Sequence, residues 1–215
     1  MQIYNPDAMT DLILAHASGR YSRKYSYLIK DGVNADTAAD VLRVMRESHE
    51  PLSFDDMHRT LWYIPLDTIK HTVSMQPSIV RAEQGKFYYA PNLPISAAEL
   101  DRIARMVQNE LTDRSYISGK ELVDMVISRC PDVAMNIGTL TPLCVRNSLG
   151  YLMRDKFSFS SAIVSAQGSE INMADVYADF ARERESFTLD ELKDLSAELN
   201  VSIYWDAVMG QVVAA

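Results

Sequence analysis

The stretch SYISGKELVDMVISRC, residues 115–130, places a serine three residues before an acid at the start of an apolar helical run. Looser versions occur in PLSFDDMHRTLWYI at 51–64 and in SFTLDELKDLSAEL at 186–199. The Ser or Thr side chain can accept a hydrogen bond from an unpaired backbone N–H, and the acid favours the positive end of a helix. The pattern therefore predicts three helices that begin in the same way. It is also a general device for starting a helix, so the elements around each copy must be compared.

Around residues 51–64 the sequence predicts three helices followed by a β-hairpin. The helix before the Ser53–Asp56 pair has an amphipathic stripe at Ala38, Val41, Leu42 and Met45. After the second helix, Pro65 lies near the start of a third, LDTIKHTVSM, and SIVRAEQGKFYYA then predicts two short strands around its Glu-Gln-Gly-Lys turn. Three helices closed by a hairpin make a winged helix-turn-helix, here assigned to residues 36–94.

The same order recurs in residues 95–168. Ser96 and Glu99 begin a first helix, and Ser118 and Glu121 begin a second. After the longer insert PDVAMNIG, Pro142 occupies the favoured first position of a third helix, TPLCVRNSLGYLMRDK. FSFSSAIVSAQG predicts a second wing. The repeated order is the main reason for expecting tandem winged helices.

Residues 169–215 predict a third helical unit. INMADVYADFARERE is amphipathic, Thr188 and Glu191 form the fourth capping box, and VSIYWDAVMGQVVAA predicts a last helix. No residues remain for a wing, so the unit is either a wingless cap or part of a longer protein. We expect the second, because the final VMGQVVAA is uncharged and needs more core to cover it. The expected fold class is mainly α: tandem winged helices after an N-terminal helical extension, residues 1–35, and before this unit.

The first unit resembles the HARE-type winged helix, a family that includes the N-terminal domain of the bacterial RNA polymerase delta subunit. The resemblance covers residues 36–91 and rests on the apolar first helix, the EPLSFDDM turn into the second, and the hairpin around a Gly that precedes aromatic residues. It implies a role in transcription or in DNA-associated complexes. It implies no functional residues, because the family offers no catalytic signature to match.

Composition is that of an ordinary globular protein, with 47% hydrophobic and 23% charged residues. The net charge is -8, and residues 169–215, with 10 acids and 3 bases, hold most of the excess. No apolar run is long enough to span a membrane, and the N-terminus lacks the pattern of a signal peptide. Cys130 and Cys144 form no CxxC pair, so we expect a cytoplasmic, bacterial protein with neither disulfides nor zinc.

In a winged helix the third helix usually enters the DNA major groove and the wing contacts the backbone. The second unit offers the best candidates. Arg can pair with guanine and Asn with adenine, while other basic side chains of the unit hold phosphates. Arg146 and Asn147 could equally make local contacts. The first unit adds a weaker basic face. The candidate nucleic-acid-binding residues of the two units are Arg146, Asn147, Arg154, Lys156, Lys70, His71 and Lys86.

The most basic stretch of the chain is GRYSRKYSYLIK, residues 19–30, which interleaves bases with tyrosines. The basic side chains of such a pattern can follow a phosphate backbone while its tyrosines stack on nucleobases, so Arg23 and Lys24 are further candidates. The alternative is an amphipathic segment whose tyrosines pack on the first unit while the bases stay in water. This alternative is slightly favoured.

No enzyme signature emerges. There is no GxxxxGK[ST] or GxGxxG loop, and the four histidines lack HExxH or metal-ligand spacing. We expect no catalytic residues, no metal and no cofactor. The leading hypothesis is a DNA-binding or transcription-associated module with phosphate-directed contacts to double-stranded DNA. The rival is a protein-interaction scaffold that binds a partner, for instance through the acidic C-terminal unit. A continuous positive face over Arg146, Arg154 and Lys156 would favour DNA, whereas bases neutralised by acids would favour the scaffold.

Overall fold

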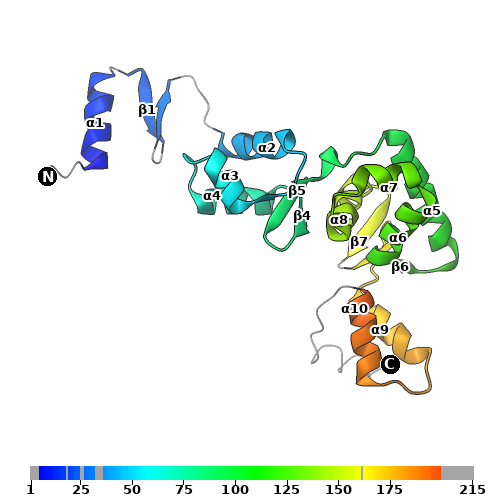
Figure 1. The fold of residues 1–215 in the computed structure, drawn as a ribbon. Coiled ribbons are helices and arrows are strands. Elements are labelled where there is room, and N and C mark those ends of the chain that lie inside the picture. Colours follow the sequence, from blue (N-terminus) through cyan, green and yellow to red (C-terminus); the bar gives the residue numbers. More distant parts are fainter. Residues whose placement is uncertain (1–4, 18, 25–26, 32–35, 161, 200–215) are drawn as a thin grey trace. The chain divides into compact units, whose positions relative to one another are not determined.

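The computed structural model describes residues 5–17, 19–24, 27–31, 36–160 and 162–199. The chain divides into two compact units, one formed by residues 1–48 and 52–76 and the other by residues 49–51 and 77–215. The described part contains ten α-helices and three small sheets, so the predicted mainly helical class is confirmed (Figure 1). None of the described helices is long and apolar enough to cross a membrane.

The first compact unit, residues 1–48 and 52–76, begins with helix α1 (Pro6–His16) and a hairpin of strands β1 (Tyr21–Lys24) and β2 (Tyr27–Lys30). The strands are antiparallel, with Tyr21 opposite Lys30 and Lys24 opposite Tyr27. Helix α1 agrees with the predicted helical extension, but the basic stretch of that extension is a β-hairpin. Its tyrosines and the pair Leu28–Ile29 suit a pleated strand better than a helix.

Three helices follow in the first unit. They are α2 (Thr37–Glu47), α3 (Phe54–Thr60) and α4 (Leu66–Met75), with the two-residue strand β3 (Leu52–Ser53) before α3. The predicted capping box is confirmed, since the Ser53 side chain accepts from the backbone N–H of Asp56 and the Asp56 carboxylate accepts in return. The apolar stripes face inward, where the buried side chains include Val41, Met45, Met57, Ile69 and Val73.

The second unit begins with the hairpin predicted around Glu-Gln-Gly-Lys. Strands β4 (Ile79–Glu83) and β5 (Lys86–Tyr89) are antiparallel, and Gly85 has the positive φ of 75° that this turn needs. The short 3-10 turn η1 (Ala90–Asn92) follows, and the Tyr88 hydroxyl donates to the Asn92 carbonyl over 2.7 Å.

The next elements of this unit are α5 (Ala97–Asp113), β6 (Tyr116–Ser118), α6 (Gly119–Arg129), α7 (Pro131–Ile137), α8 (Pro142–Leu152), β7 (Phe157–Ser160) and β8 (Ile163–Ala166). Strand β8 lies between β6 and β7 in an antiparallel sheet. The predicted capping boxes at Ser96 and Ser118 are confirmed, as is Pro142 at the first turn of α8. The insert PDVAMNIG forms α7, which was not predicted.

The hairpin β4–β5 packs on α8. Ala82 and Tyr88 of the hairpin belong to the same buried cluster as Val145 and Leu149 of α8, and all four are at most 3% exposed. The boundary between the compact units therefore lies at residues 76–77, before the hairpin, whereas the sequence predicts a boundary at residue 94.

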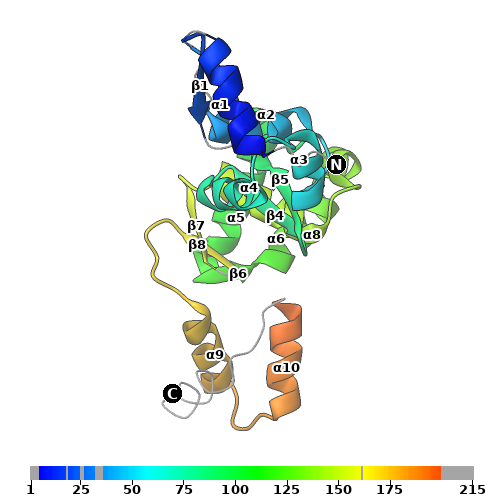
Figure 2. The ribbon, with the colours of Figure 1, turned by 90° about the vertical axis from the view of Figure 1, so that its left-hand side faces the viewer.

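Two helices complete the described chain, α9 (Met173–Arg182) and α10 (Leu189–Glu198), which run side by side (Figure 2). The Thr188–Glu191 capping box is confirmed, and Asn172 and Asp175 form another that was not predicted. Val176 packs with Ile163 of β8, so this pair of helices contacts the sheet. The last predicted helix, with Tyr204 and Trp205, lies outside the described residues.

Candidate functional site

Helix α8, which carries the best candidates for reading DNA, is covered along its length. From residue 143 to residue 152 every side chain is buried or half-buried, and of the helix residues only Pro142 is exposed. The cover is strand β4: the Thr141 hydroxyl donates to the Ala82 carbonyl, and the Asn147 amide donates to the Arg81 carbonyl over 2.8 Å. A helix must present one open face to enter a major groove, and Arg81 and Ala82 of β4 occupy part of that face of α8.

Arg146 and Asn147 bind each other and the protein. The Arg146 guanidinium donates to the Asn147 side-chain oxygen over 2.7 Å, and its second terminal nitrogen is buried. Burial lowers the pKa of Arg146 below its usual range. The guanidinium lies against the start of α6, where a Cβ added to Gly119 would come within 2.8 Å of its Nε. Neither side chain can reach a base edge without first leaving these contacts.

Arg154 and Lys156 lie beyond the end of α8 and are exposed. The Arg154 guanidinium stacks 4.2 Å from the centre of the Tyr151 ring and donates to the Tyr151 carbonyl. The Lys156 ammonium lies 2.7 Å from the Asp101 carboxylate of α5. The hydrogen bond and charge of that lysine hold the pKa of Asp101 below its usual range. One of the two bases is therefore neutralised by an acid.

Two of the three candidates in residues 36–94 are also close to acids. Lys70 on α4 lies 3.5 Å from Asp67, and Lys86 on the hairpin lies 2.7 Å from Glu83. His71 is exposed on α4. Both ion pairs join residues three apart in the sequence, a spacing that can be recognised in the sequence itself.

Of the two N-terminal candidates, Arg23 contacts two acids of α1. Its guanidinium pairs with Asp7 and lies 3.9 Å from Asp11. The side chain of Lys24 lies outside the described side chains. The stretch that is most basic in the sequence is therefore partly neutralised by the helix before it.

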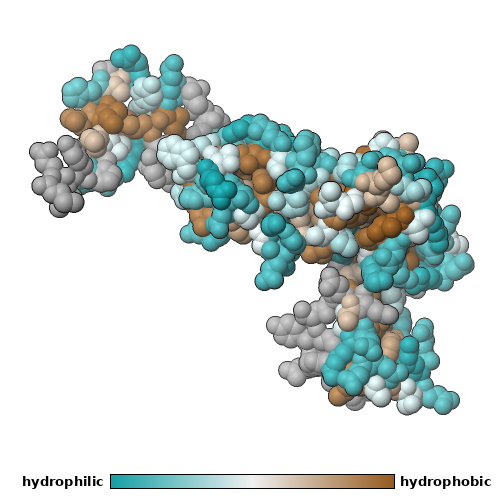
Figure 3. Space-filling model, in the orientation of Figure 1, coloured by the Kyte–Doolittle hydropathy of each residue, from teal (hydrophilic) through white to brown (hydrophobic). Residues whose placement is uncertain are grey.

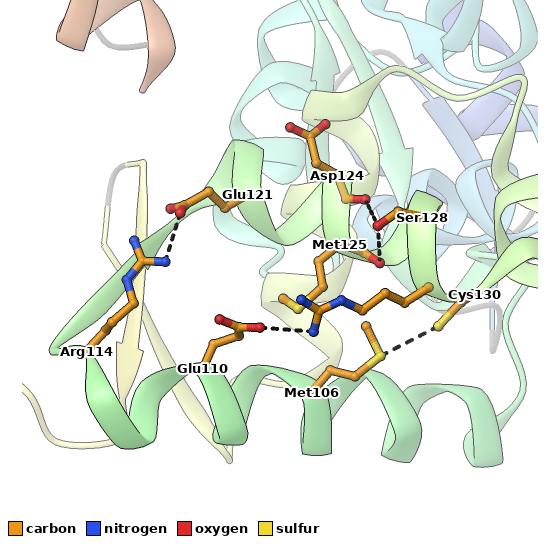
Figure 4. Close-up of polar contacts among 9 residues, drawn as sticks. Met106, Glu110, Arg114, Glu121, Asp124, Met125, Ser128 and Cys130 are labelled. Carbon is orange, nitrogen blue, oxygen red and sulfur yellow. Dashed lines mark hydrogen bonds and ion pairs between the residues drawn. The ribbon is translucent and has the colours of Figure 1, made fainter.

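Ion pairs also cross between α5 and α6 (Figure 4). Arg129 contacts Glu110 and Arg114 contacts Glu121, each over 2.9 Å. Burial raises the pKa of Glu121, but hydrogen bonds from Ser118 and Arg114 outweigh that effect and leave the pKa below its usual value. The second unit thus has a surface of mixed charge on these two helices.

An aromatic site in the first unit was not predicted. Trp62 is 77% exposed in the turn after α3, and its ring meets that of Tyr63 edge-on at 6.0 Å. A cavity of about 520 Å³ opens beside it, lined by Thr10, Leu28, His58, Trp62, Tyr63, Ile64 and Pro65. The sequence predicted a helix through about Tyr63, but α3 ends at Thr60 and leaves Trp62 outside it. An aromatic pair just before a proline was the available signal.

The cysteines are buried, as expected for Cys144 from its apolar neighbours. Burial raises the pKa of the Cys144 thiol to about 11, which disfavours the reactive thiolate. Among the residues that the structure describes, no three His, Cys, Asp or Glu side chains are grouped to hold a metal ion. The expectation of a non-enzyme stays a prediction.

Comparison with models of known protein families finds no match to this chain, and comparison with curated proteins finds none either.

Proposed function

We propose that this chain is a protein-interaction scaffold built from two winged-helix units and an acidic helical unit, working in the bacterial cytoplasm without a cofactor or catalysis. The order helix, strand, helix, helix and antiparallel hairpin occurs twice in succession, from α2 to β5 and from α5 to β8. In the second repeat α7 is added between the second and third helices of that order. The HARE-type resemblance of residues 36–91 is part of this proposal.

The observation that carries the proposal is the covered helix α8. Its side chains pack on β4, and Asn147 and Thr141 donate to carbonyls of that strand. Opening this face would expose apolar side chains such as Val145 and Leu149, each worth about 1.5–3 kcal/mol when buried. The helix that would read DNA in the second winged helix is thus used to hold a hairpin of the same chain.

The distribution of charge supports the same conclusion. Lys70, Lys86 and Lys156 each lie within 3.5 Å of a carboxylate. Exposed ion pairs are weak, but they leave little net charge to attract phosphate. An overall charge of -8 adds a general repulsion of nucleic acid.

A second candidate function is a sequence-independent contact with the DNA backbone. The observation in its favour is that Arg154 and His71 are exposed and lie outside the α8–β4 contact. Such binding would be directed to phosphates and would weaken steeply with salt.

Fluorescence anisotropy with a random-sequence duplex distinguishes the two. For the scaffold we expect no saturable binding at micromolar protein at either about 50 mM or about 200 mM salt. Binding at 50 mM that is largely lost at 200 mM would overturn the scaffold as the main function.

Two double variants that each remove two basic residues show where any DNA contact lies. Arg154→Ala with Lys156→Ala removes two bases beside β7, and Arg182→Ala with Lys193→Ala removes two from α9 and α10. If DNA binding is seen and only the first pair abolishes it, the backbone contact is established at that face. If neither pair changes a weak background signal, the DNA candidate is rejected.

A further inference from the structure

The first compact unit contains a cavity next to a strand that is paired on one edge. The cavity of about 520 Å³ is lined by Leu28 of β2, by His58 of α3, and by the turn that carries Trp62, Tyr63, Ile64 and Pro65. Thr10 of α1 completes the lining. The site therefore joins the N-terminal hairpin to the turn between α3 and α4, both within one compact unit.

Strand β2 offers a backbone edge to this site. In the described part of the chain its sheet has two strands, so β2 pairs with β1 on one side only. The N–H and C=O groups of such an edge can accept another extended segment as a new strand. A two-stranded hairpin by itself is also marginally stable in water, so a third strand would stabilise it.

Trp62, which also lines the cavity, provides an anchor. Its side chain is 77% exposed, although it stands against the Tyr63 ring. The Tyr63 hydroxyl donates to Asp40 of α2 over 3.0 Å, which fixes the ring that supports Trp62. Exposed Trp beside Tyr is the composition of an interface hot spot.

The charge near the site indicates what kind of segment fits. Residues 19–31 carry four bases and one acid. Arg23 forms an ion pair with Asp7 of α1. Arg20 and Lys30 are exposed at the same end of the hairpin, where Tyr21 pairs with Lys30. Lys30 is two residues from Leu28 and so projects from the same face of the strand. An acidic segment is complementary to this end of the hairpin.

We propose that β2 and Trp62 form a docking site for an extended, acidic segment of a partner protein, which adds to β2 as a strand and inserts an apolar side chain beside Trp62. This inference rests on the proposed scaffold function and names the partner chemistry of one of its surfaces. Backbone hydrogen bonds to β2 supply affinity, and the cavity selects the apolar side chain.

The test uses the full chain and a phage-displayed library of random twelve-residue peptides. We expect enriched sequences that alternate apolar residues with Asp or Glu. Trp62→Ala should weaken a selected peptide at least about tenfold, as for a hot-spot residue. Met135→Ala is the matched control, because Met135 is 85% exposed on α7 and should leave binding unchanged. Methylating alternate backbone nitrogens of the peptide should abolish binding if it adds as a strand.

Three outcomes would overturn the inference. They are a library that yields no binder, a binder that Trp62→Ala does not weaken, and a dimer of the chain that Trp62→Ala dissociates in light-scattering measurements. The last would assign the site to a second copy. These failures differ from failure of the scaffold itself, which would show as salt-sensitive DNA binding. Because Trp62 is exposed, circular dichroism of Trp62→Ala should match that of the unmodified chain.

Discussion

At the scale of single residues, Asn147 shows how a side chain suited to reading bases can serve the fold instead. Its amide donates to the Arg81 carbonyl 66 residues earlier, and its oxygen accepts from Arg146. An asparagine that satisfies two partners in a half-buried position has both ends of its amide in use. Its contribution is therefore to the packing of α8 on β4.

Replacing Asn147 tests this role. We expect Asn147→Ala to lower the free energy of unfolding by about 1–2 kcal/mol, because it leaves the Arg81 carbonyl and the Arg146 guanidinium without that partner. Urea denaturation measures the change. Asn136→Ala is the control, since Asn136 is exposed on α7 and should alter stability by less than about 0.5 kcal/mol. Equal effects of the two substitutions would contradict the role assigned to Asn147.

At the scale of elements, capping boxes define the starts of α3, α5, α6, α9 and α10. In each, a Ser, Thr or Asn side chain accepts a hydrogen bond from a backbone N–H two or three residues further along the chain. The acid accepts a hydrogen bond from the backbone N–H of the cap residue. At α6 the Ser118 N–H donates to Glu121 over 2.6 Å. These local bonds satisfy helix-end N–H groups that would otherwise lack partners.

The capping carboxylates predict a loss of stability in acid. Glu99, Glu121 and Glu191 all have a pKa below the usual value of 4.5, Glu99 and Glu191 because they accept hydrogen bonds from their cap residues. For Glu121 the bonds from Ser118 and Arg114 outweigh burial. As the pH falls, these carboxylates therefore bind protons at a higher pH in the unfolded chain than in the folded chain. The stabilisation present above pH 4.5 is lost as the pH falls through the lowered pKa values.

Denaturation at a series of pH values measures this effect. We expect Glu121→Gln to be less stable than the unmodified chain at pH 6 and to lose less stability between pH 5 and pH 3. Glu185→Gln is the control, because Glu185 is exposed and lies outside the capping boxes. A pH dependence that Glu121→Gln leaves unchanged would show that this box does not contribute.

At the scale of the whole molecule, the hairpin β4–β5 belongs to the compact unit that contains α5–α8. Ala82, Tyr88 and Leu93 share a buried cluster with Leu149 and Val145. The hairpin β4–β5 therefore contributes buried side chains to the core of the second compact unit.

Two fragments test that boundary. We expect residues 77–215 to unfold cooperatively, and residues 95–215 to be less stable by roughly 3–5 kcal/mol because the side chains of Tyr88 and Leu93 are lost from the core. Urea denaturation followed by circular dichroism compares them. Equal midpoints for the two fragments would show that the hairpin is not part of this core.

The sequence by itself determined the helix starts at Ser53, Ser96, Ser118 and Thr188, the apolar stripes and the hairpin at Gly85. Each of these depends on residues within about one or two turns of the chain, so the local pattern is sufficient. The tertiary structure alone decided which groups Lys156 and Asn147 meet. The partner of Lys156 lies 55 residues away and that of Asn147 lies 66 residues away, and no local pattern specifies such pairs. Packing of β4 on α8 brought Asn147 to the Arg81 carbonyl, and it used for the fold the helix that the sequence had suggested for DNA.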